Sequence, residues 1–138
     1  MDWSLSSDFY KYSDSELRSL NSLSIAYIGD CVYDLYLRNH VMKKFKTMKS
    51  NKLHLEVINY VSAKAQKNAY FKIKHLLNED EEIYFKKGRN SKVKTIPKNS
   101  SVSDYKISTG FETIIGYLYI TKKFDRLDFI LNEILKGE

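Results

Sequence analysis

Two acidic side chains lie inside apolar stretches of the sequence, and each has a glycine close by. Asp30 follows Gly29 in SIAYIGDCVYD, and Glu112 lies one helical turn before Gly116 in STGFETIIGYLYI. If both stretches are helices that cross at these glycines, the two carboxylates meet. Two close carboxylates repel each other unless a proton or a cation lies between them. Oxygen ligands of this kind suit Mg²⁺ or Mn²⁺, with water and substrate phosphates completing the coordination.

Asp34 lies four residues beyond Asp30, on the same face of the predicted helix. The alternative to a metal site is that these acids are unrelated. In that case each carboxylate lies at the surface or pairs with a Lys or Arg.

The stretch KKGRNSKVKTIPKNSS, residues 86–101, contains six cations and no acid. Its cations alternate with amide and hydroxyl groups, which suits contacts with phosphate and ribose. It has no aromatic residue, which argues against binding single strands by base stacking and favours the backbone of a duplex. The alternative is that residues 86–101 form a solvated, flexible loop without a ligand. For Lys64 in SAKAQ, the alternative is an ordinary position on the solvent-exposed face of a helix. The candidate RNA-binding residues are Lys64, Lys86, Lys87, Arg89, Asn90, Lys92, Lys94, Thr95, Lys98 and Asn99.

The elements that must position these residues are helices, because the 138 residues include only five glycines and one proline. Residues 23–42 are apolar on almost every side, which predicts a central, buried helix. We predict one all-α domain of six or seven helices over residues 1–138, with 1–19 as an extension and first helix. The other predicted features are helical periodicity over 51–77, an acidic turn at 78–82 that starts a short helix to 87, a basic loop at 88–102, and helices at 103–121 and 124–135.

The overall charge agrees with an anionic partner such as nucleic acid, since 23 Lys and Arg outnumber 17 Asp and Glu and give a net charge of +6. One cysteine, Cys31, allows no internal disulfide, which favours a reducing, cytoplasmic setting. No histidine lies near Cys31 to activate it, so we predict a small buried thiol. The sequence shows neither a signal peptide nor a membrane span.

The two acidic stretches resemble a known family. AYIGDCVYDLYLR resembles the signature helix of the ribonuclease III domain, with Gly29 and Asp30 at its centre. STGFETIIGYLYI resembles the second acidic helix of that domain, with Glu112 as its metal-binding glutamate. SAKAQ, KKGRN and TIPKN resemble the compact branch, mini-ribonuclease III, in the same order. The resemblance extends over about residues 20–135.

The resemblance implies a homodimer that packs on its signature helices and holds duplex RNA in a basic valley across both subunits. It implies Mg²⁺-dependent hydrolysis, with Mn²⁺ able to substitute, that leaves 5′-phosphate and 3′-hydroxyl ends. Members of the compact branch trim the ends of the 23S ribosomal RNA precursor, assisted by a large-subunit ribosomal protein. They have no double-stranded-RNA-binding domain, and we expect none here.

The site departs from the pattern of full-length ribonuclease III at two positions. Ala26 stands four residues before Asp30 where those enzymes have a glutamate, and Thr109 stands three residues before Glu112 where they have an aspartate. The compact branch shares both losses, so Asp30 and Glu112 are the predicted catalytic and metal-binding residues. Asp34 and Thr109 are candidates for orienting a water at the metal.

The predicted function is therefore endonucleolytic cleavage of double-stranded RNA. The main alternative is a non-catalytic RNA-binding or ribosome-associated protein on the same fold, which the loss of two acids would favour. A helical scaffold for other proteins is a third possibility, but it leaves the paired acids and the basic loop unexplained.

Overall fold

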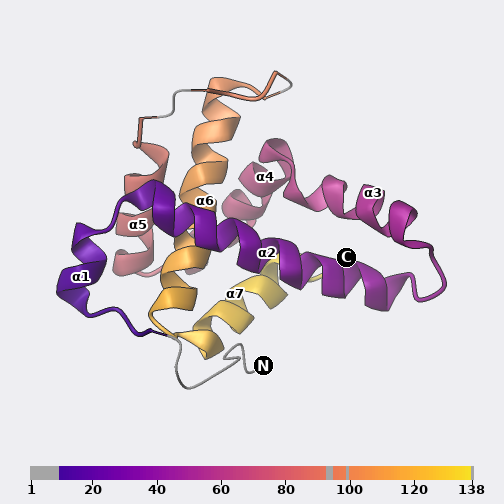
Figure 1. Ribbon diagram of the computed structural model, residues 1–138, viewed down its shortest axis with the longest axis horizontal. Coiled ribbons are helices and arrows are strands. Elements are labelled where there is room, and N and C mark those ends of the chain that lie inside the picture. Colours follow the sequence, from indigo (N-terminus) through magenta and orange to yellow (C-terminus); the bar gives the residue numbers. More distant parts are fainter. Residues whose placement is uncertain (1–9, 93–94, 99, 138) are drawn as a thin grey trace.

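The computed structural model describes residues 10–92, 95–98 and 100–137, and these form seven α-helices and one 3₁₀ turn (Figure 1). No strand occurs within these ranges, which confirms the all-α prediction. No helix among them is long and apolar enough to span a membrane. The elements are α1 (Asp14–Ser19), α2 (Ser22–Lys44), α3 (Ser50–Val61), α4 (Ala63–Ile73), η1 (Lys74–Leu76), α5 (Glu79–Arg89), α6 (Val102–Ile120) and α7 (Phe124–Leu135).

The first two helices begin at capping residues, Ser13 and Asn21. The Ser13 side chain accepts a hydrogen bond from the backbone N–H of Glu16, and the Glu16 side chain accepts one from the N–H of Ser13. The Asn21 side chain accepts from the N–H of Leu23 at the start of α2. These bonds satisfy backbone donors that a helix leaves unpaired at its first turn.

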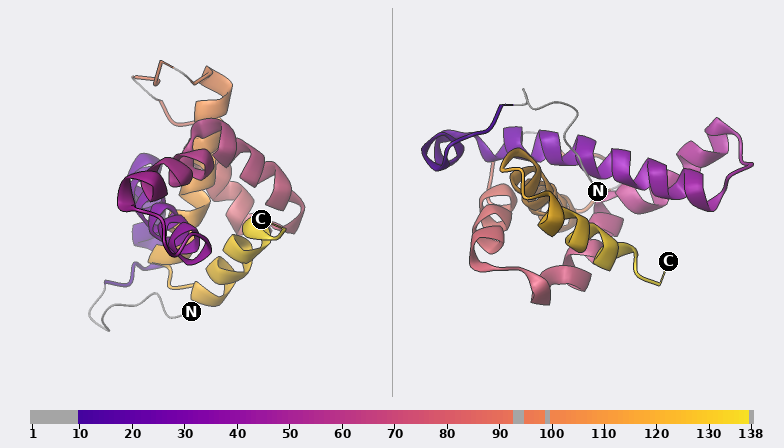
Figure 2. Two further views of the ribbon diagram at one scale, coloured as in Figure 1. Left: turned by 90° about the vertical axis from the view of Figure 1, so that its right-hand side faces the viewer. Right: turned by 90° about the horizontal axis from the view of Figure 1, so that it is seen from below.

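Residues 51–77 have one continuous helical period in sequence, but the structure divides them into two helices. Ser62 ends α3 and begins α4 with an extended backbone, φ −62° and ψ 156°. Its hydroxyl caps the new helix by accepting from the N–H of Ala65 at 3.2 Å. Because the cap lets α4 take a new direction, α3 packs along α2 while α4 packs against α6 (Figures 1 and 2).

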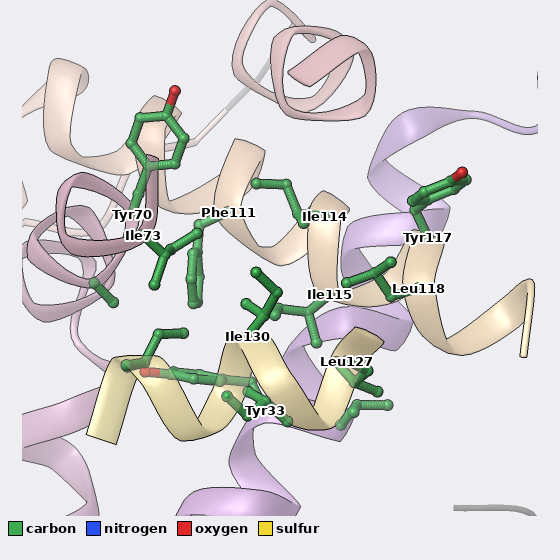
Figure 3. Close-up of a cluster of buried hydrophobic side chains, with 14 of the residues drawn as sticks. Tyr33, Tyr70, Ile73, Phe111, Ile114, Ile115, Tyr117, Leu118, Leu127 and Ile130 are labelled. Carbon is green, nitrogen blue, oxygen red and sulfur yellow. The ribbon is translucent and has the colours of Figure 1, made fainter. Parts of the chain in front are cut away.

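The most buried helix is α6, which contacts α2, α4, α5 and α7. Its ring of Phe111 lies edge-on to the ring of Tyr33 from α2, with centroids 5.0 Å apart. Tyr70 of α4 stacks on Phe85 of α5 at 3.8 Å. Figure 3 shows the cluster, whose labelled members are Tyr33, Tyr70, Ile73, Phe111, Ile114, Ile115, Tyr117, Leu118, Leu127 and Ile130.

The prediction that residues 23–42 are buried on all sides is wrong for this single chain. One side of α2 packs on α6 and α3, but the outer side leaves Tyr27 72% and Leu35 60% exposed. A helix that is apolar on all sides in sequence can therefore have an exposed face. The sequence pattern shows which residues are apolar, but it does not show which surface covers each side of the helix.

The helix α5 is longer than predicted and shortens the basic loop to residues 90–101. Gly88 lies in its last turn, where an added Cβ would be 2.1 Å from Oγ1 of Thr113 on α6. Gly88 therefore allows close packing of α5 on α6, whereas the sequence placed it in the loop. This crossing fixes the point at which the loop leaves α5.

Candidate active site

The site lies where α2 and α6 cross with their backbones in contact. An added Cβ on Gly29 would be 1.8 Å from the carbonyl oxygen of Glu112, and one on Gly116 would be 2.0 Å from the carbonyl oxygen of Ile25. No side chain fits at either position, since real Cβ contacts are never so short. The two helices therefore cross at these glycines, as the sequence predicts.

The crossing brings the side chains of Asp30 and Glu112 together. The pKa of Glu112 is raised to about 9, first by burial, then by the negative charge of Asp30, and then by a side-chain hydrogen bond with Asp30. At neutral pH Glu112 therefore keeps its proton and donates it to Asp30. A divalent cation in place of that proton would favour the charged form of both groups, so this pair fits a cation.

Among the described residues, this site offers a cation two carboxylates. The described part of the chain holds no group of three or more His, Cys, Asp and Glu side chains that could bind a metal. The two positions where larger enzymes carry acids are buried: Ala26 is 6% exposed, and the Thr109 hydroxyl donates to the carbonyl of Tyr105 at 3.0 Å. Two carboxylates with room for water and phosphate are the ligand set that Mg²⁺ uses with phosphate substrates.

Asp34 is engaged elsewhere. Its carboxylate accepts from Nε of Arg38 at 2.9 Å, and both side chains are substantially exposed. Arg38 was missed from the sequence as a partner of Asp34, although a position four residues later is the usual signal for such a pair. Thr109 likewise uses its hydroxyl within its own helix.

The predicted RNA-binding residues gather at one end of α6. Lys86 and Lys87 are exposed on the last turns of α5, and Lys87 lies over the ring of Tyr84 with Nζ 4.9 Å from the centroid. The guanidinium of Arg89 lies over the ring of Phe85, and its Nε donates to Asn90 at 3.1 Å. The loop residues Lys92, Thr95 and Lys98 are exposed, while Lys94 and Asn99 lie outside the described residues.

Lys64 belongs to the same end of the molecule, although it comes from another helix. Lys67, one turn further along α4, forms an ion pair with Asp104 in the first turn of α6 at 2.8 Å. A hydrogen bond from Lys67 chiefly lowers the pKa of Asp104, and the charge of Lys64 lowers it further. The start of α4, with Lys64, therefore lies beside the start of α6 (Figure 1).

The prediction of a buried thiol at Cys31 is wrong, since Cys31 is exposed. It lies four residues from Tyr27 and four from Leu35, on the outer face of α2.

Comparison with known proteins places both acidic helices in one matched region. The family model of the Ribonuclease III domain matches residues 23–123. The Mini-ribonuclease 3 of Clostridium tetani is 42% identical over 91% of this chain and 83% of its own length. The Mini-ribonuclease 3 of Enterococcus faecalis is 39% identical over 88% and 92%. A crystal structure of a protein from Fusobacterium nucleatum superposes with a TM-score of 0.79 and 31% identity, covering 88% of this chain and 96% of that one.

Proposed function

The chain belongs to the ribonuclease III family, and on that premise we propose that it cleaves double-stranded RNA with Mg²⁺ held by Asp30 and Glu112. It is an endoribonuclease of the ribonuclease III type. The observation that carries the metal assignment is the pair of carboxylates at the glycine crossing, which share one proton at neutral pH. Mn²⁺ prefers the same oxygen ligands and can take the same place.

In this mechanism the protein holds the cation and aligns the RNA backbone. When bound, Mg²⁺ supplies a Lewis acid that activates water and offsets charge on the phosphoryl oxygens. Asp30 and Glu112 would hold the cation as carboxylate ligands, with the proton that Glu112 holds at neutral pH released to solvent. The rigid contact of α2 with α6 keeps the two carboxylates at a fixed separation, which positions the scissile phosphodiester without reorganisation. Hydrolysis then leaves 5′-phosphate and 3′-hydroxyl ends.

The basic end of α6 binds the RNA backbone in this proposal. The exposed cations at the end of α5, in the loop 90–101 and at Lys64 supply phosphate contacts, with Asn90 and Thr95 as neutral hydrogen-bonding groups. Specificity then comes from duplex shape, because the deep groove of A-form RNA hides the base edges. Affinity falls steeply as salt rises.

A second copy of the chain covers the outer face of α2 in the working enzyme. The exposed apolar side chains there follow one stripe of the helix, and a stripe of this kind is typical of a protein interface. Replacing Leu35 with Glu is expected to give monomers in a light-scattering measurement of mass. A dimer of unchanged stability would contradict this interface. The stripe consists of Leu23, Tyr27, Cys31, Leu35 and Met42.

The proposed substrate is the 23S ribosomal RNA precursor, cleaved near its ends in the cytoplasm with help from a large-subunit ribosomal protein. This extends the resemblance to the compact branch and agrees with the net charge of +6. One domain over residues 1–138 carries the whole activity in this proposal.

The decisive experiment is cleavage of a labelled duplex precursor by wild type, Asp30→Asn and Glu112→Gln, each with Mg²⁺ and with EDTA. Wild type cleaves only with Mg²⁺, and neither variant cleaves at a comparable rate. If a folded variant cleaved at near the wild-type rate, the metal site would lie elsewhere.

One observation favours the alternative of a non-catalytic RNA-binding protein. Ala26 and Thr109 stand at two positions where full-length ribonuclease III enzymes carry acids. RNA binding in EDTA without cleavage in Mg²⁺ would support it.

Replacing Lys92, Lys94 and Lys98 with Ala tests the loop in the same assays. Unchanged affinity and salt dependence would remove the loop from the binding surface.

A further inference from the structure

A second cationic surface lies at the turn between α2 and α3, the end of α2 that is distant from α1 (Figure 1). Five exposed lysines line one open hollow there, together with Phe45 and Met48. The sequence contains no acid from residue 35 to residue 55. These corner lysines are Lys43, Lys44, Lys46, Lys49 and Lys52.

The corner lysines have no counter-charge in the described structure. The ion pairs among the described residues involve other cations, namely Arg38, Lys67, Arg126 and Lys136. Lys44 lies over the ring of Phe45, with Nζ 5.6 Å from the centroid, and this contact leaves its charge in place. Lysines gathered around one hollow repel one another, so an anion bound there lowers the electrostatic energy of the free protein.

The position of Lys49 and Lys52 adds to this positive charge. They lie at the start of α3, whose first turn contains no acid and whose capping residue, Lys49, makes no side-chain cap. The start of a helix carries a partial positive charge, so lysines there are unfavourable. By contrast, the first turn of α5 contains four acids, that of α1 contains two, and those of α6 and α7 contain one each, whereas α2 and α4, like α3, have none. The corner therefore carries more positive charge than its fold requires.

We propose that the corner lysines bind the phosphate backbone of the same RNA duplex, away from the bond that is cleaved. This rests on the proposed function. Lys44 is 14 residues after Asp30 on one helix, which places it about 21 Å along the axis at 1.5 Å per residue. The loop 90–101 lies at the start of α6, in another part of the molecule (Figure 1).

The chemistry of the corner favours a nucleic-acid backbone. Lysine is a mobile point charge, which suits a row of phosphates better than the paired hydrogen bonds of one fixed carboxylate. Only a duplex that continues about 20 Å beyond the cleaved bond reaches the corner, since that is the reach of α2. The corner therefore favours long duplexes over short ones.

The test compares Lys46→Ala/Lys49→Ala with the control Lys74→Ala/Lys136→Ala. Each pair removes two exposed lysines, and neither Lys74 nor Lys136 lines the hollow. Binding is measured in EDTA over a range of salt, with one duplex longer and one shorter than the reach of α2. For the long duplex we expect the corner variant to lose affinity several-fold and to lower the salt slope by about 2, one unit for each phosphate contact. The short duplex and the control pair should show no such change.

Three results would overturn the proposal. They are unchanged binding of the long duplex, an equal loss for both duplexes, and a loss that follows a change in the mass of the protein, which would assign the corner to a protein interface. Cleavage in Mg²⁺ separates this from the proposed function. If wild type binds long duplexes through the corner but cleaves none, the cleavage mechanism fails and the corner site stands.

Discussion

Two glutamates, the buried Glu81 and the half-buried Glu112, have opposite surroundings in this fold. Glu81 is fully buried at the start of α5, where it accepts from Nε and Nη2 of Arg126 at 2.9 Å each and from the N–H of Asn78 at 3.0 Å. Burial would raise its pKa, but the hydrogen bonds from Arg126 and Asn78 outweigh burial and lower it. Glu112 faces another carboxylate, and its pKa rises to about 9.

The difference between the two sites lies in their neighbours, since both glutamates lie on helices packed around the core. Every oxygen of Glu81 has a donor, so that site is complete without a ligand. At the crossing of α2 and α6, two acids meet with only a proton to separate them. A protein tolerates such an arrangement where a ligand relieves it, so we expect Glu81 to serve stability and Glu112 to serve the proposed metal site.

The largest expected effect separates the two glutamates by activity. Glu112→Gln should lower the rate of RNA cleavage by more than about 100-fold, because it removes one of two charged metal ligands and each factor of ten corresponds to about 1.4 kcal/mol. Its far-ultraviolet circular dichroism should match that of wild type, since Gln can still hydrogen-bond with Asp30. Glu81→Gln is the matched control and should keep its activity per folded molecule. Equal losses of activity in the two variants would end the distinction.

The next largest effect is on stability and concerns Glu81. Arg126→Met leaves the Glu81 carboxylate buried without its partner, and breaking such a pair costs about 3 kcal/mol or more. Urea unfolding should report this loss, while cleavage by the folded fraction stays unchanged.

The double variant Glu81→Gln/Arg126→Met is the control for that loss. It removes both charges, so it should recover much of the stability that Arg126→Met loses. If Arg126→Met unfolds no more easily than wild type, the pair contributes little and the contrast with Glu112 weakens.

The meeting of Glu112 with Asp30 could be predicted from sequence, and the pairing of Glu81 with Arg126 could not. Asp30 and Glu112 are visible because each acid interrupts an apolar helical pattern beside a glycine, and these signals are local. Glu81 lies among three other acids in residues 79–82, a run that indicates an exposed turn. Its burial follows from Arg126, 45 residues later, and from the packing of helices that no local pattern records.

The helix boundaries show the same limit. The helical segments follow from periodicity, but the break at Ser62 that divides residues 51–77 into two helices and the place of Gly88 inside α5 depend on how α4 and α5 pack against α6. The corner lysines were missed from the sequence, because only the turn between α2 and α3 brings them around one hollow.

A smaller effect is expected from a substitution that separates α2 from α6. Gly29→Ala places a methyl group 1.8 Å from the carbonyl oxygen of Glu112, and overpacking of this kind typically costs about 2 kcal/mol. Cleavage should also fall by more than about tenfold, because the separation of the carboxylates changes and positioning is a large part of catalysis.

The control for Gly29→Ala is Gly88→Ala, which crowds the other side of α6 against the side chain of Thr113. It should lose stability but retain cleavage by the folded protein. If Gly29→Ala cleaves as fast as Gly88→Ala, the glycine crossing does not set the geometry of the site.

The two glutamates should also give opposite dependences of stability on pH. The pKa of Glu112 rises from 4.5 to about 9 on folding, so the folded protein holds an extra proton between these values. Its contribution to the free energy of unfolding is complete below pH 4.5 and is lost as the pH rises toward 9. Each unit of pKa difference corresponds to about 1.4 kcal/mol, so the decline should be measurable by urea unfolding in EDTA.

Glu81 has a lowered pKa, and its contribution is present above pH 4.5 and is lost as the pH falls below that value. Glu112→Gln should remove the alkaline decline and leave the acid one. Mg²⁺ at pH 8 should restore stability to wild type but not to Glu112→Gln. A wild-type stability that stays constant from pH 5 to pH 9 would contradict the shared proton.

The smallest expected effect concerns Asp34, the acid nearest to the functional pair in sequence. Its carboxylate pairs with Arg38 at 2.9 Å in an exposed position, where ion pairs contribute about 0.5 kcal/mol. The charge that raises the pKa of Glu112 is that of Asp30. Asp34→Asn should therefore cost no more stability than Arg38→Gln and should keep cleavage within about threefold, or 0.7 kcal/mol. A much larger loss of cleavage in Asp34→Asn alone would show that Asp34 leaves Arg38 to orient water at the metal, and the functional site would then depend on three carboxylates.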